Sequence, residues 1–186
     1  GTSGTTIDAS SAQLYDRLID YDEDRQAFVP ALATSWQALN DGKRYRFTLR
    51  DNVKFHDTPW FTPSRTFNAD DVVFSFRRWM HSDHPYHEVN GGSYPFFTAS
   101  GLNKLIESVR AVDDHTVEFE LSRSDSSFLA NLATDFAVIL SAEYGADLLA
   151  QGSPELFDKH PIGTGPFVFE DFRKDLIIRY NRHEDY

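Results

Sequence analysis

Residues 41–50 read Asp-Gly-Lys-Arg-Tyr-Arg-Phe-Thr-Leu-Arg and open the stretch that decides the fold, which runs from Asp41 to Met80. Apolar and charged side chains alternate along residues 44–50. A period of two predicts a strand with one buried face and one solvated face. The Asn-Asp-Gly sequence at residues 40–42 is a strong hairpin signal. We therefore expect two antiparallel strands flanking this turn.

The same stretch ends in a predicted amphipathic helix over residues 68–80. Asn68 suits the N-cap position, and Asp70 and Asp71 place negative charge in the first turn, where the helix dipole favours it. Apolar residues recur at helical spacing along it; they are Val72, Val73, Phe76, Trp79 and Met80. Between the strand and this helix, the sequence predicts a short strand over residues 53–56 and a loop with two prolines.

The rest of the chain predicts strands and helices without regular strand–helix–strand alternation. The predicted strands cover residues 18–21, 105–112, 115–121, 136–140, 167–172 and 176–180. Helices are expected over residues 8–18 and 126–133, after Ser141, and in a short turn that starts at Pro30. Three hairpins among a few helices predict an α+β fold.

Composition and charge exclude several classes of protein. The 186 residues carry 18 Lys and Arg against 29 Asp and Glu, a net charge of −11. Such an acidic chain is a poor candidate for nucleic-acid binding, which needs a basic surface. Without cysteine, it forms no disulfide and no zinc–thiolate site. The sequence has no apolar run of the roughly 20 residues that a membrane span needs, and its start lacks the pattern of a signal peptide.

Three histidines after the predicted helix are the main candidates for metal binding. His81, His84 and His87 are spaced three residues apart, with carboxylates alongside. Imidazole and carboxylate groups together suit zinc or another divalent ion. However, Pro85 interrupts the helix that would align them, and their spacing matches no common zinc signature. The alternative is a polar loop after a helix end, and we predict no metal site.

The sequence gives little support to an enzyme. The adjacent pairs Asp70-Asp71 and Asp113-Asp114 point apart on a helix or a strand, so neither forms a catalytic dyad. The Gly-Thr-Gly-Pro sequence at residues 163–166 precedes a predicted strand and lacks the Lys and Ser/Thr of a phosphate loop. It is better explained as a turn that leads into the strand. We expect no catalytic residues.

The motifs of the central stretch also carry a resemblance to a known family. They are Ala33, Trp36, Asp41-Gly42, Tyr45-x-Phe-x-Leu-Arg50, Val53-x-Phe-His56 and Asn68-Ala-Asp-Asp-Val-Val-Phe74. This pattern resembles the extracytoplasmic peptide-binding proteins of ABC importers, of the dipeptide-, oligopeptide- and SapA-binding types. The Trp-Phe-Thr-Pro sequence at residues 60–63 favours the SapA type, which is associated with antimicrobial peptides and haem.

The resemblance implies a periplasmic protein that captures peptides and delivers them to a membrane ABC permease. It implies a monomer, no cofactor and no nucleic-acid partner. The fold would be a fragment of the type II periplasmic-binding-protein fold. Residues 1–18 and 141–186 would belong to lobe I, residues 19–140 to a mixed α/β domain inserted into it, and the second, ligand-closing lobe would be absent from this chain.

The resemblance also implies which residues contact the ligand. Ser3, Gly4 and Thr5 fall in the loop whose main chain runs alongside the bound peptide, a mode that reads peptides of any sequence. Tyr86 and Tyr94 fall where the inserted domain approaches the ligand, although simple packing of their loop is the alternative. Haem or metal-complex binding within the same family remains the second function, and hydrolysis the third.

Overall fold

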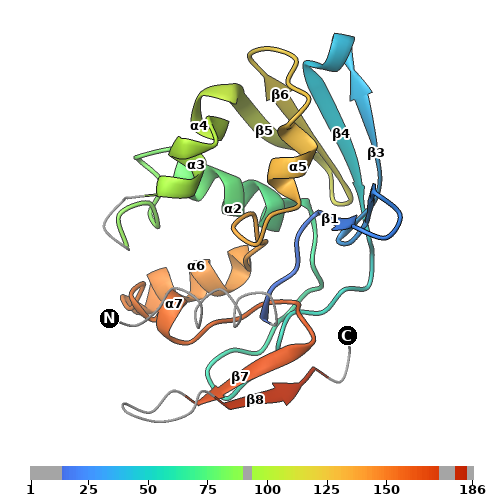
Figure 1. The fold of residues 1–186 in the computed structure, drawn as a ribbon. Helices are drawn as coiled ribbons and strands as arrows, with labels where there is room; N and C mark the ends of the chain where they lie inside the picture. The colour runs from blue at the N-terminus through green and yellow to red at the C-terminus, as the bar shows by residue number, and fades with distance from the viewer. Residues whose placement is uncertain (1–13, 90–93, 172–178, 184–186) are drawn as a thin grey trace.

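The centre of the fold is a four-stranded antiparallel sheet, with helices gathered on one of its sides (Figure 1). This computed structural model describes residues 14–89, 94–171 and 179–183. The strand order in the sheet is β3-β4-β6-β5. The strands and the main helix packed on the sheet are β3 (Ala33–Leu39), β4 (Arg44–Leu49), β5 (Ile106–Asp113), β6 (Thr116–Leu121) and α2 (Ala69–Met80). This α+β architecture confirms the predicted fold class.

The two faces of this sheet differ as the alternation in the sequence predicts. Phe47 lies opposite Trp36 on one side and Val117 on the other, and both Phe47 and Val117 are fully buried. On the opposite face, Arg46 lies across from Glu118, which lies across from Arg110. Period-two patterning therefore separates an aromatic core from an outer face with ion pairs.

The turn between β3 and β4 confirms the predicted hairpin. Asn40, Asp41 and Gly42 form a single 3-10 turn, η1 (Asn40–Gly42), and all three have positive φ, at 52°, 55° and 83°. Asn, Asp and Gly tolerate this left-handed region better than other residues do. The local sequence therefore sets the register of the two strands.

Helix α2 begins where the sequence predicts. The Asn68 side chain accepts a hydrogen bond from Asp70 N at 2.9 Å, and the Asp71 carboxylate accepts one from Asn68 N at 3.0 Å. These reciprocal bonds form a capping box that satisfies amides at the start of the helix. Val72 and Phe76 then face the core with almost no exposed surface, so the predicted apolar stripe is confirmed at these positions.

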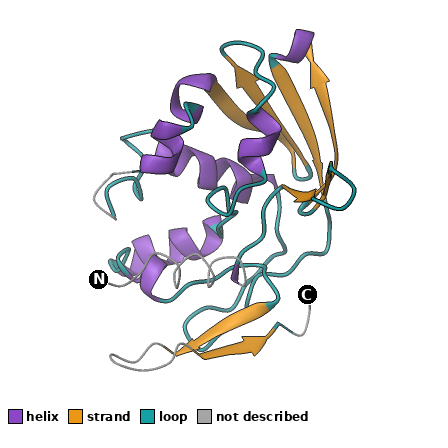
Figure 2. Ribbon diagram, viewed as in Figure 1, coloured by secondary structure: helices purple, strands orange, loops and turns teal. Residues whose placement is uncertain are grey.

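The remaining helices and strands partly cover the large sheet and partly lie beyond it. Figure 2 shows the helices on one side of that sheet, and the β7–β8 hairpin at the end of the molecule away from the β3–β4 turn. The strands are β1 (Ile19–Asp22), β2 (Ala27–Pro30), β7 (Phe167–Asp171) and β8 (Arg179–Arg182). The helices are α3 (Pro95–Ala99), α4 (Leu102–Leu105), α5 (Phe128–Leu132), α6 (Ala142–Gln151) and α7 (Leu156–Lys159). None of the helices in the described ranges combines the length and the apolar character needed to cross a membrane.

Three local predictions are wrong. The apolar run at residues 136–140 forms no strand, only a single bridge from Val138 to Arg17. Pro30 ends strand β2 instead of starting a helix, because residues 27–30 pair with β1. Residues 53–56, predicted as a short strand, form no strand and lie in no sheet of the described chain. In each case long-range packing overrides a local pattern.

The helix predicted over residues 8–18 lies mostly outside the described residues. Its last part is not helical, because residues 15–18 are irregular apart from the bridge at Arg17. The β5–β6 and β7–β8 hairpins and the cap at Ser141, which accepts a hydrogen bond from Tyr144 N at 3.1 Å, are confirmed.

Candidate functional site

A turn late in the chain packs directly against the first described residues. Gly165 N donates to Leu14 O at 2.9 Å, and the Thr164 hydroxyl donates to the Asp16 carboxylate at 3.0 Å. A Cβ added at Gly163 would lie 2.0 Å from Leu14 O. Only glycine fits at that position, because the two backbones are in contact there.

His56 holds the same turn from the other side. Its side chain is fully buried. Ring Nδ1 accepts a hydrogen bond from Gly163 N at 3.2 Å, and Nε2–H donates to Gly165 O at 2.9 Å. The backbone N–H of His56 also donates to Gly163 O at 2.9 Å. These bonds require a neutral ring with its proton on Nε2. We call Leu14, Asp16, His56 and residues 163–165 the turn seat.

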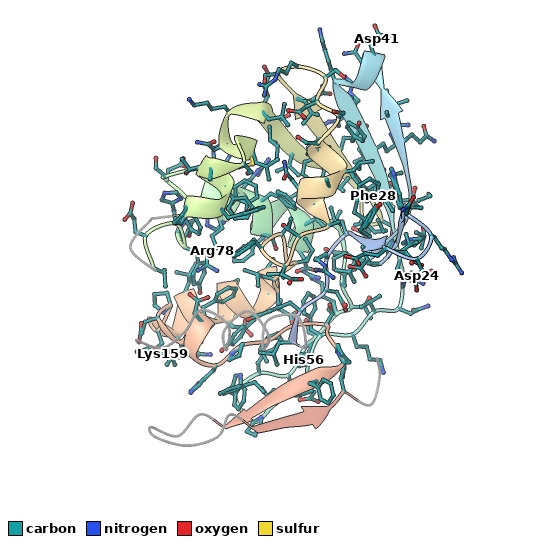
Figure 3. All side chains as sticks on the ribbon, in the orientation of Figure 1. Asp24, Phe28, Asp41, His56, Arg78 and Lys159 are labelled. Atoms are coloured by element: carbon teal, nitrogen blue, oxygen red, sulfur yellow. The ribbon has the colours of Figure 1, made fainter. Side chains whose placement is uncertain are left out.

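The charge state of His56 follows from its surroundings. Burial lowers the pKa of His56 to about 4, because the charged form would lose its hydration; the bond to Gly165 O opposes this shift, and His183 adds to it. The His183 ring lies edge-on to that of His56, with centroids 4.8 Å apart, and its Nε2 donates to Lys54 O at 3.0 Å. Figure 3 shows His56 between the β7–β8 hairpin and the rest of the molecule.

A cavity of about 390 Å³ opens beside the turn seat. Its lining includes acidic and basic side chains; they are Asp16, Asp20, Asp51, Arg50, Lys54 and His183, and the lining also includes Thr164. This mixture favours polar contents over apolar ones. The Thr164 hydroxyl is an unsuitable nucleophile, because Thr164 is only 1% exposed and its hydroxyl already donates to Asp16. The arrangement therefore supports binding better than catalysis.

Tyr86, one of the predicted ligand residues, lies in the interior. Its side chain has no exposed surface, and its hydroxyl donates to Gly145 O at 2.7 Å. The ring packs on Phe74 and Phe157 and lies under the Arg78 guanidinium. Burial raises the pKa of Tyr86 to about 12. This is the packing that the alternative interpretation expects; contact with a ligand stays a prediction.

Tyr94 and the histidine loop are tied to backbone groups. The Tyr94 hydroxyl donates to His87 O at 3.0 Å, and its ring is partly buried. His84 Nδ1 accepts from Tyr86 N at 3.1 Å, while His87 Nδ1 lies 2.8 Å from Arg78 O. Within the described residues, no group of three His, Cys, Asp or Glu side chains is placed to hold a metal ion.

The sequence analysis did not predict the turn seat, and the structure does not test part of the predicted ligand site. Ser3, Gly4 and Thr5 lie outside the described residues. In the sequence, His56 stands out only as part of a family motif. Nothing near it indicates that its partners lie at residues 163–165. The sequence does predict a turn at residues 163–166, and its Gly-Thr-Gly was the one signal in the sequence that pointed to this place.

Comparison with known proteins finds a matching family and several similar solute-binding proteins. Residues 27–186 match the family described as bacterial extracellular solute-binding proteins, family 5 Middle. Heme-binding protein A of Haemophilus influenzae is 50% identical over 98% of this chain and 34% of its own length. Dipeptide-binding protein of Escherichia coli is 50% identical, and SapA of Salmonella typhimurium 47%, each over 100% of this chain and 35% or 34% of its own length.

A solved structure shows the same fold. The dipeptide-binding protein of Pseudoalteromonas sp. SM9913, in complex with Met-Leu, superposes with a TM-score of 0.95 at 49% identity. The match covers 100% of this chain and 37% of that protein. This chain thus spans about a third of the length of the relatives that it matches and has the fold of that part of a periplasmic binding protein. The chain belongs to the bacterial extracellular solute-binding proteins of family 5, a family of transport proteins.

Proposed function

We propose that this chain is part of a periplasmic solute-binding protein that captures peptides and delivers them to the permease of an ABC importer. The observation that carries the proposal is the 49% identity and TM-score of 0.95 to a dipeptide-binding protein solved with a bound dipeptide. The equally high identity to Dipeptide-binding protein of Escherichia coli supports the same ligand class.

In this proposal, binding depends on the main chain and on closure between lobes. Ser3, Gly4 and Thr5 would bond to the peptide backbone, which all peptides share. Residues 1–18 and 141–186 would form part of lobe I and residues 19–140 the inserted domain, with the closing lobe contributed by sequence outside this chain. The protein would act as a monomer without catalysis, and its net charge of −11 would disfavour nucleic acid.

Calorimetry with the dipeptide Met-Leu tests this function. This chain alone should show no measurable affinity, whereas a polypeptide of the relatives' full length that contains it should bind with about micromolar affinity. N-acetylated Met-Leu is the matched control, because it removes the charged amino group and should bind much more weakly. Tight binding by this chain alone, or none by the full-length polypeptide, would contradict the proposal.

Variants test the predicted ligand tyrosines in the full-length polypeptide. Tyr94→Phe keeps the ring and removes only the hydroxyl that bonds to His87 O. We expect weaker peptide binding if Tyr94 contacts the ligand and an unchanged dissociation constant if it only packs the loop. Tyr86→Phe applies the same test to Tyr86, with its unfolding free energy measured in parallel because the ring is buried.

Haem binding is the second candidate, and its support is the 50% identity to Heme-binding protein A. A haem titration of the full-length polypeptide should then give a Soret shift that His84→Ala abolishes. His81→Ala is the control, because His81 is exposed on the same loop. An unchanged Soret band in the unsubstituted protein would exclude this function.

A further inference from the structure

The turn seat joins three segments that lie far apart in the chain. The first segment is Leu14 to Asp16, the second contains His56, and the third is residues 163–165. The third segment contacts each of the other two: Gly165 N bonds to Leu14 O and Thr164 to Asp16, and His56 bonds to both glycines. Any movement of the turn is therefore transmitted to the backbone of residues 14–16.

Protonation of His56 would break this arrangement in a defined way. Nδ1 accepts the Gly163 N–H when the ring is neutral, whereas a protonated Nδ1 would point its own N–H at the same donor. Two donors facing each other in a buried site repel and leave both groups without an acceptor. The Nε2–H bond to Gly165 O survives in either state, so the effect falls on Gly163, which contacts Leu14 O.

The charged groups around His56 give its proton no direct stabilisation in the described residues. His183 faces the ring from the end of β8, and a positive charge there would oppose a second one. On the segment that contains His56, the Lys54 carbonyl accepts a hydrogen bond from His183, and the Asp57 carboxylate accepts one from Thr62. From residues 14–16, the Asp16 carboxylate is directed to the Thr164 hydroxyl.

We propose that His56 is a positioning residue for ligand binding, whose neutral ring fixes the Gly163–Gly165 turn and thereby the backbone of Leu14–Asp16. This segment continues from the predicted peptide-binding residues 3–5, so the inference rests on the proposed function. Acidification that protonates His56 releases the turn and weakens ligand binding. Because burial lowers the pKa of His56 to about 4, the ring is neutral at neutral pH and its hydrogen bonds to the turn are kept.

Linkage provides the test, because a proton that weakens ligand binding must itself be bound more weakly when the ligand is present. The experiment follows the imidazole signal of His56 by NMR during a pH titration of the full-length polypeptide, free and saturated with Met-Leu. The signal is assigned by its absence in His56→Asn. We expect Met-Leu to lower the pKa of His56 by about one, a tenfold coupling. The imidazole signal of exposed His81 is the control and should have the same chemical shift with and without Met-Leu.

Affinity at neutral pH gives the second measurement. His56→Asn retains an acceptor for Gly163 N–H and should bind Met-Leu within about threefold of the unsubstituted protein, whereas His56→Leu should bind about tenfold more weakly. An unchanged pKa of His56 on saturation with ligand overturns the inference. This titration uses the unsubstituted protein, so it decides the matter even if His56→Leu fails to fold. If the unsubstituted protein does not bind Met-Leu at all, the proposed function itself fails.

Discussion

Two buried polar clusters hold distant segments of this chain together. One is built around a charged side chain and the other around a neutral one. Around Asp71, a fully buried carboxylate accepts hydrogen bonds from Arg65 at 2.8 and 3.0 Å, from Asn68 N at 3.0 Å and from Ala142 N at 2.8 Å. In the turn seat, a fully buried imidazole without charge bonds to two backbone groups.

The difference shows how each charge state is maintained. A buried carboxylate is tolerated when a cation and several donors compensate for its lost hydration. A buried imidazole with only backbone partners has no such compensation for a charge, so it remains neutral. The Asp71 cluster should therefore depend on the presence of its charge, and the turn seat on the absence of one.

The largest effect should come from removing the charge of the Asp71 cluster. Asp71→Ala leaves the Arg65 guanidinium and two backbone amides without their acceptor, and we expect the free energy of unfolding to fall by about 3–5 kcal/mol. Urea denaturation measures this loss. Asp70→Ala, in the same helical turn but exposed, should cost far less. Equal losses for the two variants would show that the buried network contributes nothing beyond helix-start charge.

The next effect comes from adding a charge to the turn seat. The pKa of His56 is lowered from 6.5 to about 4 in the folded state, so between these values the unfolded chain binds the proton and the folded protein does not. The contribution of neutral His56 to the free energy of unfolding is fully present above about pH 6.5. It falls as the pH decreases toward 4 and changes no further below pH 4. The total loss should be about 3 kcal/mol.

This pH dependence is measured as the difference between the unsubstituted protein and His56→Asn. Urea denaturation at several pH values between 7 and about 4 gives both curves, and the titration of the carboxylates cancels in the difference. Parallel curves would contradict a buried neutral histidine and would remove the contrast with the Asp71 cluster.

The backbone contact of the turn seat should have a smaller effect. Gly163→Ala would force a Cβ against Leu14 O, and we expect a loss of about 2 kcal/mol in unfolding free energy. Gly152→Ala is the control, since a Cβ there meets no atom but has a φ of +73°, which costs about 1 kcal/mol. Combining Gly163→Ala with His56→Asn should cost less than the sum, because both loosen one turn.

The smallest effect should come from removing one of three arginines that share a single carboxylate. Arg110 lies 3.2 Å from Glu118 on the outer face of the sheet, with its side chain 53% exposed. Because Arg44 and Arg46 also contact Glu118, Arg110→Ala should change the unfolding free energy by no more than about 0.5–1 kcal/mol, and less at high salt. A loss as large as that for Asp71→Ala would show that Arg44 and Arg46 do not compensate for the cation removed from beside Glu118, whose own side chain is 2% exposed.

The sequence predicted those parts of the fold that are encoded locally. The hairpin at residues 40–42 and the start of α2 at Asn68 each depend on residues within a few positions of one another. The apolar run at residues 136–140 misled the prediction, because a strand also needs a partner, and only Val138 finds one. Periodicity describes a segment, whereas pairing depends on the whole chain.

The turn seat could not be predicted for the same reason. His56 and Gly163 are 107 positions apart, and Thr164 and Asp16 are 148 apart. His56 has an ordinary local context, with a hydrophobic residue before it and Asp57 after it. Only the structure shows that its ring is buried and that both of its nitrogens are used.

The contact between Leu14 and Gly165 also constrains the order of events when the protein is made. Residues 163–165 emerge from the ribosome about 150 residues after Leu14 and Asp16, which takes roughly 10–30 s at common translation rates. Over that interval the hydrogen bonds from Gly165 to Leu14 and from Thr164 to Asp16 cannot form. The turn seat can therefore form only after the large sheet and α2 have been synthesised, so a partly made chain lacks this joint between its segments.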